Sequence, residues 1–443
     1  MEQKLFVGYA RVNITPEESV PMAGYGNTSR RLSQNVRDPL YATCLAFTDA
    51  QGETALLYTT DLIRAYEDTT RRVRTALEQE LGLPRDKVMI AATHTHSGPD
   101  LFNTGFESIT KYKDMYVERL TEAAKLAMAD RKEAKLFAGE ARPERMNFVR
   151  HYKMADGTYA GSNFGRFKDN VIVGHTSPND PQMRIVKIAR EGGEDIVLMN
   201  WAAHPCFTGG LSEPNISADY IAEVRKYVED KTGMRFAFFQ GAAGNQNARS
   251  RIAGEHRTDD PVEYGQLLGE YAIQALENVK SVAGGKVKGM LREQQCMFDH
   301  SDDDKIEHAR EVRKFWLESF DRPASCRLAR SYGMNSPYAA NSVISRYDRP
   351  AGGEMVEMGA LTVGDLAFAC APYEMFAVNG VFIKENSPFE NTFVVSCCNQ
   401  GHSYQASEYA FEHGCYEVDQ RKFPKGTAET LAGVVTDMLK EMK

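Results

Sequence analysis

The sequence predicts an α/β fold in which mixed β-sheets are flanked by α-helices. Short runs that are apolar throughout recur along the chain, as expected of strands buried on both faces. Helical patterns lie between several of these runs, and this alternation is typical of helices that cover a parallel or mixed sheet. The predicted strands are TALLYTT (54–60), KVMIAA (87–92), IVLMNW (196–201), RFAFF (235–239), DLAFACA (365–371) and TFVVSCC (392–398).

Four segments have the apolar spacing of helices. They lie at 66–81, near 111–130, at 217–233 and at 261–279. Ser217 and Asp219 stand at the start of the third segment, where either side chain can cap the first turn.

Two regions interrupt this alternation. Residues 141–182 are rich in Arg, Asn and Gly, and we expect them to run over the surface. Residues 299–336 begin with an acidic run that favours a helix start, and we expect its carboxylates to face solvent. Because no repeat or linker divides the chain, we expect one continuous domain over 1–443.

The composition excludes several classes of protein. Of the 443 residues, 42% are apolar and 26% are charged, which is typical of a globular protein. The net charge of −8 argues against a nucleic-acid partner and against a polybasic membrane anchor. Neither a signal-peptide core nor a membrane-length apolar stretch is present in the sequence. The eight cysteines are scattered, as expected of free thiols in the cytoplasm. We therefore expect a cytoplasmic protein, and we allow for a homo-oligomer.

Two histidines directly follow the apolar run at 87–92. Residues i and i+2 of a strand point the same way, so His94 and His96 would share one face at the exposed end of that strand. This arrangement suits a metal ligand beside an acid or base. It equally suits an ordinary turn.

Other predicted strands also end in polar residues. His204, Glu374 and Tyr404 each follow an apolar run, and a small-residue loop follows the run at 235–239. Because ligands of α/β proteins bind outside the carboxyl ends of strands, we expect these ends to meet at one cleft. Two imidazoles and one carboxylate are a common ligand set for catalytic zinc, with one position left open. The candidate metal ligands are therefore His94, His204 and Glu374.

Several longer segments occur in the order known from one enzyme family. They are THTHSGPD (93–100), NWAAHPC (200–206), FFQGAAGNQN (238–247), APYEMF (371–376) and SYQASEYAFEHGCYEV (403–418). From about residue 6 to about residue 420 the chain resembles the catalytic domain of the neutral/alkaline ceramidase family.

The resemblance implies a role for individual residues. It implies that a catalytic Zn²⁺ is held by His94, His204, Glu374 and Tyr404. It also implies that His96 faces the scissile amide.

Further residues of the site follow from the same resemblance. It implies that Arg150, Gln240 and Asn247 contact the substrate, although Arg150 could instead form a surface salt bridge. Asp61 and Asp219 would orient ligands, or would be ordinary strand-end and helix-cap residues. The turn Gly24–Tyr25–Gly26 would border the cleft.

The chain also departs from the family pattern. Where the ceramidases have an active-site serine, this chain has Asn247, which can form hydrogen bonds but cannot act as a nucleophile. We also expect no C-terminal sandwich domain. The chain therefore resembles a cytoplasmic, ceramidase-like branch for which ceramide is not the expected substrate.

These observations predict a zinc-dependent hydrolase. It would cleave an amide, ester or lactone bond of a small polar or anionic substrate by means of a metal-activated water. His96 would transfer the proton to the leaving group, and Tyr404 would stabilise the oxyanion. Three alternatives stay open at this point. They are a cysteine hydrolase that uses Cys206, a non-catalytic homologue that binds a metal or ligand, and a zinc-dependent lyase.

Overall fold

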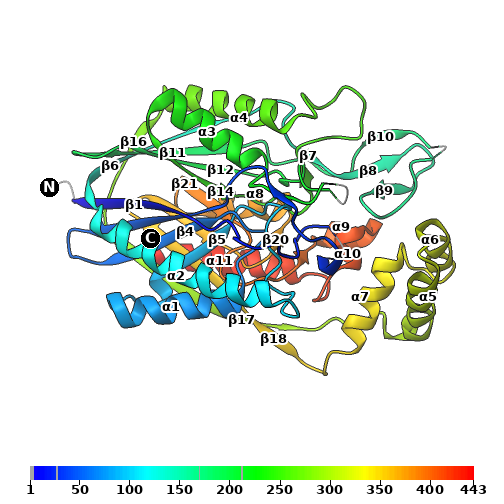
Figure 1. Cartoon of the computed structure of the whole chain (residues 1–443). Helices are drawn as coiled ribbons and strands as arrows, with labels where there is room; N and C mark the ends of the chain where they lie inside the picture. Colours follow the sequence, from blue (N-terminus) through cyan, green and yellow to red (C-terminus); the bar gives the residue numbers. More distant parts are fainter. Residues whose placement is uncertain (1–3, 26–27, 169, 211–212) are drawn as a thin grey trace.

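The computed structural model describes residues 4–25, 28–168, 170–210 and 213–443. It confirms the predicted fold class, since two mixed sheets are flanked by helices (Figure 1). The strands of the larger sheet are β1 (Leu5–Asn13), β3 (Tyr41–Asp49), β4 (Thr54–Thr60), β5 (Val88–Ala92), β6 (Lys132–Ala141), β11 (Met183–Arg190), β12 (Ile196–Trp201), β14 (Arg235–Gln240) and β16 (Lys280–Val282). Their order is β14-β12-β11-β6-β1-β3-β4-β5, with β16 paired to β6.

The second sheet has four strands in the order β17-β18-β19-β21. Their bounds are β17 (Val287–Met297), β18 (Gly353–Val363), β19 (Leu366–Cys370) and β21 (Asn391–Val395). The shorter strands are β2 (Asn35–Val36) with β13 (Asn215–Ile216), β7 (Phe148–Val149) with β15 (Gln246–Asn247), β20 (Glu374–Met375) with β22 (Tyr404–Gln405), and the three-stranded sheet of β8 (His151–Met154), β9 (Tyr159–Gly161) and β10 (Ile172–His175).

The helices cover the outer faces of the sheets and one end of the molecule. They are α1 (Glu67–Leu81), α2 (Glu107–Ala129), α3 (Tyr220–Thr232), α4 (Pro261–Leu276), α5 (Ile306–Ser319), α6 (Arg322–Ser331), α7 (Pro337–Tyr347), α8 (Ala377–Asn386), α9 (Glu408–His413), α10 (Tyr416–Asp419) and α11 (Thr427–Met442). Short 3-10 turns lie at Thr28–Arg30, Arg85–Lys87 and Asp303–Lys305. Helices α5 to α7 gather at the same end of the molecule as the β8–β10 sheet (Figure 1).

The two sheets pack face to face around a shared apolar core. Phe239 of the larger sheet contacts Phe368 of the smaller one, with ring centroids 5.9 Å apart. On β4, Leu57 points into this core while its neighbours Leu56 and Tyr58 pack against α1 and α2. Because successive strand residues point to opposite faces, a strand covered on both sides must be apolar throughout. This explains the continuous apolar runs of the sequence.

The predicted elements are present with small shifts at their ends. The helix expected at 66–81 spans Glu67–Leu81 and ends at Gly82, whose φ of 67° suits glycine. Asp219 caps α3 by accepting a hydrogen bond from the amide of Tyr220.

Two expectations about the irregular regions were wrong. Residues 141–182 form β7 to β10 and contribute buried side chains, among them Tyr152 and Met154, instead of only crossing the surface. The acidic run does not simply face solvent, because Asp299 and Asp302 form ion pairs with Arg421.

Within the described part of the chain, no helix combines the length and the apolar character that crossing a bilayer requires.

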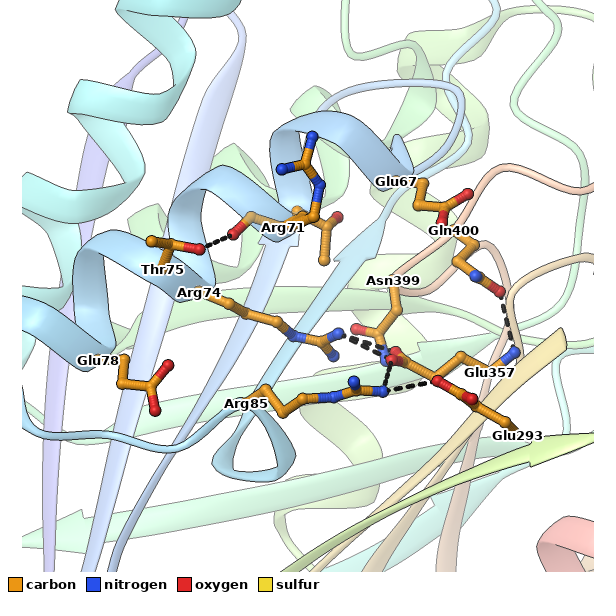
Figure 2. Close-up of a pocket in the computed structure, with 11 residues that line it drawn as sticks. Glu67, Arg71, Arg74, Thr75, Glu78, Arg85, Glu293, Glu357, Asn399 and Gln400 are labelled. Carbon is orange, nitrogen blue, oxygen red and sulfur yellow. Dashed lines mark hydrogen bonds and ion pairs between the residues drawn. The ribbon is translucent and has the colours of Figure 1, made fainter. Parts of the chain in front are cut away.

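A buried ion pair joins α1 to the second sheet. Nη1 of Arg74 lies 2.8 Å from Oε1 of Glu357, and both side chains are almost fully buried. The Nε and Nη2 atoms of Arg74 donate to the Val88 carbonyl. Arg85 reaches the same carboxylate from a largely exposed position (Figure 2).

We expect Arg74→Ala to lower the free energy of unfolding by about 3 kcal/mol, because it leaves the buried Glu357 carboxylate without its buried partner. Arg85→Ala is the matched control and should cost less than about 1 kcal/mol, because its guanidinium is exposed. Urea denaturation measures both values. Equal effects of the two variants would contradict this assignment.

Candidate metal centre

The candidate metal ligands lie together where strands of both sheets end. His94 follows β5, His204 follows β12, and Glu374 lies shortly after β19. The Nε2 atoms of the two imidazoles are 3.2 Å apart. Oε2 of Glu374 lies 3.1 Å from Nε2 of His94 and 3.3 Å from Nε2 of His204. Three groups that are far apart in the sequence thus converge on one point.

The hydrogen bonds on the other side of each imidazole decide which nitrogen has the proton. Nδ1 of His94 lies 2.6 Å from the Ile63 carbonyl, and Nδ1 of His204 lies 2.7 Å from the Ala243 carbonyl. A carbonyl can only accept, so each Nδ1 is the donor, and each Nε2 presents a lone pair. Two lone pairs and a carboxylate oxygen then face one another.

This arrangement needs a cation. Three acceptors about 3 Å apart repel one another unless a positive charge lies among them. Among the described residues, Oε2 of Glu374 is also a buried oxygen without a hydrogen-bond donor. Two neutral imidazoles oriented by backbone carbonyls, together with one carboxylate, are a donor set that fits Zn²⁺. The residues present therefore fit the metal that the sequence predicts.

The pKa values of these groups also indicate that a positive charge is favourable at this point. Burial would raise the pKa of Glu374, but the adjacent His94 and His204 imidazoles outweigh burial and hold it well below its ordinary value. Burial would lower the pKa of His94, but the Cys397 thiol and the Glu374 carboxylate outweigh burial and raise it to about 10. Burial, helped by Arg150, lowers the pKa of His204 to about 4. In the absence of a metal, a protonated His94 imidazole would supply the positive charge among the three groups.

The backbone at the site is strained. His94 has a φ of 70° and Cys397, whose thiol lies 3.5 Å from Nδ1 of His94, has a φ of 56°. Such conformations of non-glycine residues cost about 1–3 kcal/mol each and persist where surrounding contacts hold them. The His94 amide is held by a 2.9 Å hydrogen bond to the Leu62 carbonyl.

His96 and Tyr404 border the three acceptors. Nε2 of His96 lies 3.4 Å from Nε2 of His94, and the hydroxyl of Tyr404 lies 3.5 Å from Nε2 of His204. Burial, with His94 and His204 nearby, lowers the pKa of His96 well below its ordinary value, so this imidazole is neutral. Burial raises the pKa of Tyr404, so its phenol is protonated and can donate.

The N-terminal turn lies against His96. The Tyr25 ring meets the imidazole edge-on, with centroids 5.4 Å apart. Gly24 has a φ of 106°, and a Cβ at this position would lie 2.5 Å from Cβ of His96, so no larger residue fits. The third residue of the expected turn, Gly26, lies outside the described residues.

Arg150 is buried, so the alternative of a surface salt bridge is wrong. Its Nε donates to Oε1 of Glu417 at 2.7 Å, and Oε2 of Glu417 bonds to Nε2 of His151 at the same distance. The guanidinium lies over the Tyr404 ring at 5.4 Å, and its Nη1 lies 3.4 Å from Oδ1 of Asn247. Glu417 thus neutralises Arg150 and orients it toward Tyr404.

Glu417 and His151 were not recognised from the sequence. Glu417 is the next-to-last residue of the segment EHGCYEV, and no local spacing links it to Arg150 or His151. These two residues and Cys415 also form a second group whose ligand atoms could hold a metal ion. Hydrogen bonds to Arg150 and His151 already satisfy Glu417 in that group.

The remaining predicted residues support the loops around the site. Gln240 is buried, and its Nε2 donates to the Ala203 carbonyl, next to His204. Asp61 pairs with Arg225 at 2.8 Å, and Asp219 accepts hydrogen bonds from the amide and hydroxyl of Thr208. Both aspartates belong to buried hydrogen-bond networks. Among the described residues, neither forms a hydrogen bond with His94, His204 or Glu374.

Cys206 does not have the properties of an activated nucleophile. Burial raises the pKa of its thiol to about 11, and the nearby Asp219 acts in the same direction. A nucleophilic cysteine needs the opposite setting, one that stabilises the thiolate.

No family model matches this chain. The curated neutral ceramidase of Pseudomonas aeruginosa is 26% identical over 257 residues, which represent 54% of this chain and 36% of that protein. The chain therefore aligns with just over a third of the length of this relative.

Solved structures extend the similarity over the whole chain. The crystal structure of neutral ceramidase from Pseudomonas aeruginosa matches with a TM-score of 0.75 and 17% identity, covering 100% of this chain and 75% of that one. A ceramidase complexed with C2 matches with a TM-score of 0.70 and 18% identity, with the same coverage. The chain is thus similar to neutral ceramidase in part of its sequence and in its fold. The resemblance inferred from the sequence is confirmed, and the fold is that of the neutral ceramidase catalytic domain.

We expect the purified protein to contain about one zinc per chain. His94→Ala and His204→Ala should each lose most of it, because each variant removes one of three ligands. His308→Ala changes an exposed imidazole on α5 and is the matched control. Elemental analysis measures the zinc content, and full metal content in both ligand variants would contradict the site.

Proposed function

We propose that this chain is a zinc-dependent hydrolase that cleaves an amide, ester or lactone bond of a small polar or anionic substrate. The observation that supports this most directly is the convergence of two imidazole lone pairs and one carboxylate on a single point. The homology to neutral ceramidase supports amide hydrolysis as the reaction class.

The bound metal supplies Lewis acidity, which makes water a nucleophile near neutral pH. In this proposal His94, His204 and Glu374 hold the zinc ion, and Tyr404 completes its surroundings. Because two protein imidazoles and one carboxylate leave a position for water or substrate, the absence of the family serine does not prevent hydrolysis.

The remaining side chains act on the substrate and on the proton. The neutral imidazole of His96 accepts a proton and passes it to the leaving group. The protonated phenol of Tyr404 donates a hydrogen bond to the oxygen on which negative charge develops. Arg150, whose charge Glu417 balances, holds Tyr404 and Asn247 in position.

Asn247 stands where the ceramidases have a serine, and its side-chain amide can form hydrogen bonds with the substrate but cannot act as a nucleophile. Its backbone pairs with Phe148 on β7, and its side chain faces Arg150. This position suits contact with a polar group of the substrate. Gln240, the last residue of β14, is the second residue to which we assign substrate contact, and its Nε2 donates to the Ala203 carbonyl next to His204.

The proposal includes a cytoplasmic location. All eight cysteines are unpaired, and free thiols are usual in a reducing compartment. The oligomeric state stays a prediction, with a homo-oligomer allowed.

Turnover tests the proposal directly. A panel of N-acyl amino acids, small amides, esters and lactones should yield at least one substrate whose hydrolysis a chelator abolishes and added zinc restores. Inactivation by iodoacetamide but not by a chelator would instead favour the cysteine mechanism. Zinc binding without turnover on any substrate would favour a non-catalytic homologue.

Asn247→Ala should raise KM for that substrate, by roughly tenfold, while the zinc content stays near one per chain, because Asn247 is a binding residue and not a ligand. Steady-state kinetics and elemental analysis measure the two effects. Loss of zinc together with activity would instead make Asn247 part of the metal site.

A further inference from the structure

A cavity lies close to the metal centre, on the side of Arg64. It has a volume of about 350 Å³, and Arg64 forms part of its wall. Nη2 of Arg64 lies 4.0 Å from Oε1 of Glu374, and its Nη1 donates to the Gly401 carbonyl at 3.1 Å. Residues 401–403, which directly precede Tyr404, form another part of the wall. The cavity is therefore linked to the metal centre by the contact of Arg64 with Glu374 and by the segment that leads into Tyr404.

The wall of this cavity is strongly cationic. None of its lining residues is acidic. Its serine hydroxyls can donate further hydrogen bonds. The cationic lining residues are Arg64, Arg346, Arg349, Arg421 and Lys422.

Three of these cations are balanced from behind the wall. Asp302 pairs with Arg346 at 2.8 Å and also with Arg421, and Glu354 pairs with Lys422.

Two cations are not balanced in this way. Among the described residues, Arg64 has one carboxylate within ion-pair distance, that of Glu374 at 4.0 Å, whose charge the metal would engage. Arg349 forms no ion pair with any described residue, its Nε is buried without a hydrogen-bond partner, and its guanidinium lies over the Phe298 ring. A second buried donor, Nε of Arg346, is also unpartnered within the described chain.

We propose that this cavity is a subsite for an anionic group of the substrate, a carboxylate or a phosphate, which Arg349 and Arg64 bind. This inference rests on the proposed function and narrows its substrate class to acylated compounds with a negative charge. A guanidinium matches both anions with parallel hydrogen bonds, and an anion would balance the charge of these two partly buried cations. Because Glu417 already balances the charge of Arg150, we assign anion binding to Arg349 and Arg64 instead of Arg150.

The cavity in Figure 2 also contains several arginines, but it lacks the charge balance that would favour an anion. It has a volume of about 230 Å³ and contains Arg71, Arg74 and Arg85. Its wall also contains glutamates, two of which pair with these arginines. Its mixed charge gives it no preference for anions, so Arg71 provides a matched control.

The test compares substrates that differ only in charge. An N-acylglycine and its methyl ester form the carboxylate arm, and an N-acylethanolamine phosphate and the unphosphorylated N-acylethanolamine form the phosphate arm. Hydrolysis of the amide bond is measured in each case. The charged member of at least one arm should have a KM about tenfold lower than its neutral partner.

Arg349→Ala should remove this difference by raising KM for the charged substrate about tenfold, with kcat and the neutral substrate little changed. Arg349→Lys should restore part of it, and Arg71→Ala should behave as wild type. Gly401→Ala offers a second route, because its Cβ would lie 2.9 Å from Cδ of Arg64 and displace that side chain. It should weaken the preference for the charged substrate without loss of zinc.

The outcomes separate this inference from the proposed function. Zinc-dependent turnover with no charge preference, or with a preference that Arg349→Ala leaves intact, overturns the subsite and leaves the hydrolase proposal standing. If no substrate is turned over, calorimetry with inorganic phosphate tests the cavity alone. Binding that Arg349→Ala abolishes supports the subsite, and absence of binding to the wild-type protein overturns it.

Discussion

Two hydrogen bonds to backbone carbonyls determine the chemistry of this molecule. Because Ile63 and Ala243 accept the Nδ1 protons of His94 and His204, both Nε2 lone pairs are turned toward Glu374. The folded chain thereby holds three acceptors in contact, which is unfavourable without a positive charge. If the proposed site binds its cation, folding and cation binding are coupled, since the contacts that cost stability in the metal-free chain then become favourable.

The sheets provide the rigidity that such an arrangement needs. Parallel pairs β4–β5, β12–β14 and β19–β21 end at the same place, and the loops that follow them are tied to one another. The carbonyls that orient the imidazoles belong to the loops after β4 and β14. The left-handed backbone of His94 and Cys397 is held by this framework. A shift of one strand end would therefore change the ligand geometry and the strain together.

The positive charges around the centre have different functions because their partners differ. Glu417 balances Arg150, whose guanidinium lies over the Tyr404 ring and near Asn247. In the adjoining cavity, the acidic partners stand behind the wall, and Arg349 lacks one among the described residues. Burial is common to both regions. The position of the carboxylates thus distinguishes Arg150, which is paired, from Arg349, to which we assign the proposed subsite.

The sequence alone was sufficient for the elements that depend on local pattern. Doubly buried strands such as β4 must be apolar throughout, so the runs at 54–60 and 392–398 could be recognised without a structure. His94, His204 and Glu374 could be selected because they follow such runs and because the chain resembles the ceramidases. Residues 141–182 were misjudged, since strands of two to four residues leave no periodic signal.

Contacts between distant segments required the tertiary structure. Arg150 and Glu417 are 267 positions apart, and nothing local to either predicts that they pair. The same holds for the cationic cavity, whose wall combines residues of α7 with residues from the loops after β4, β5, α7, β21 and α10. Periodicity is a property of neighbouring residues and can be found in the sequence. The balance of a buried charge depends on which distant segments the fold brings together, so only the three-dimensional arrangement could decide it.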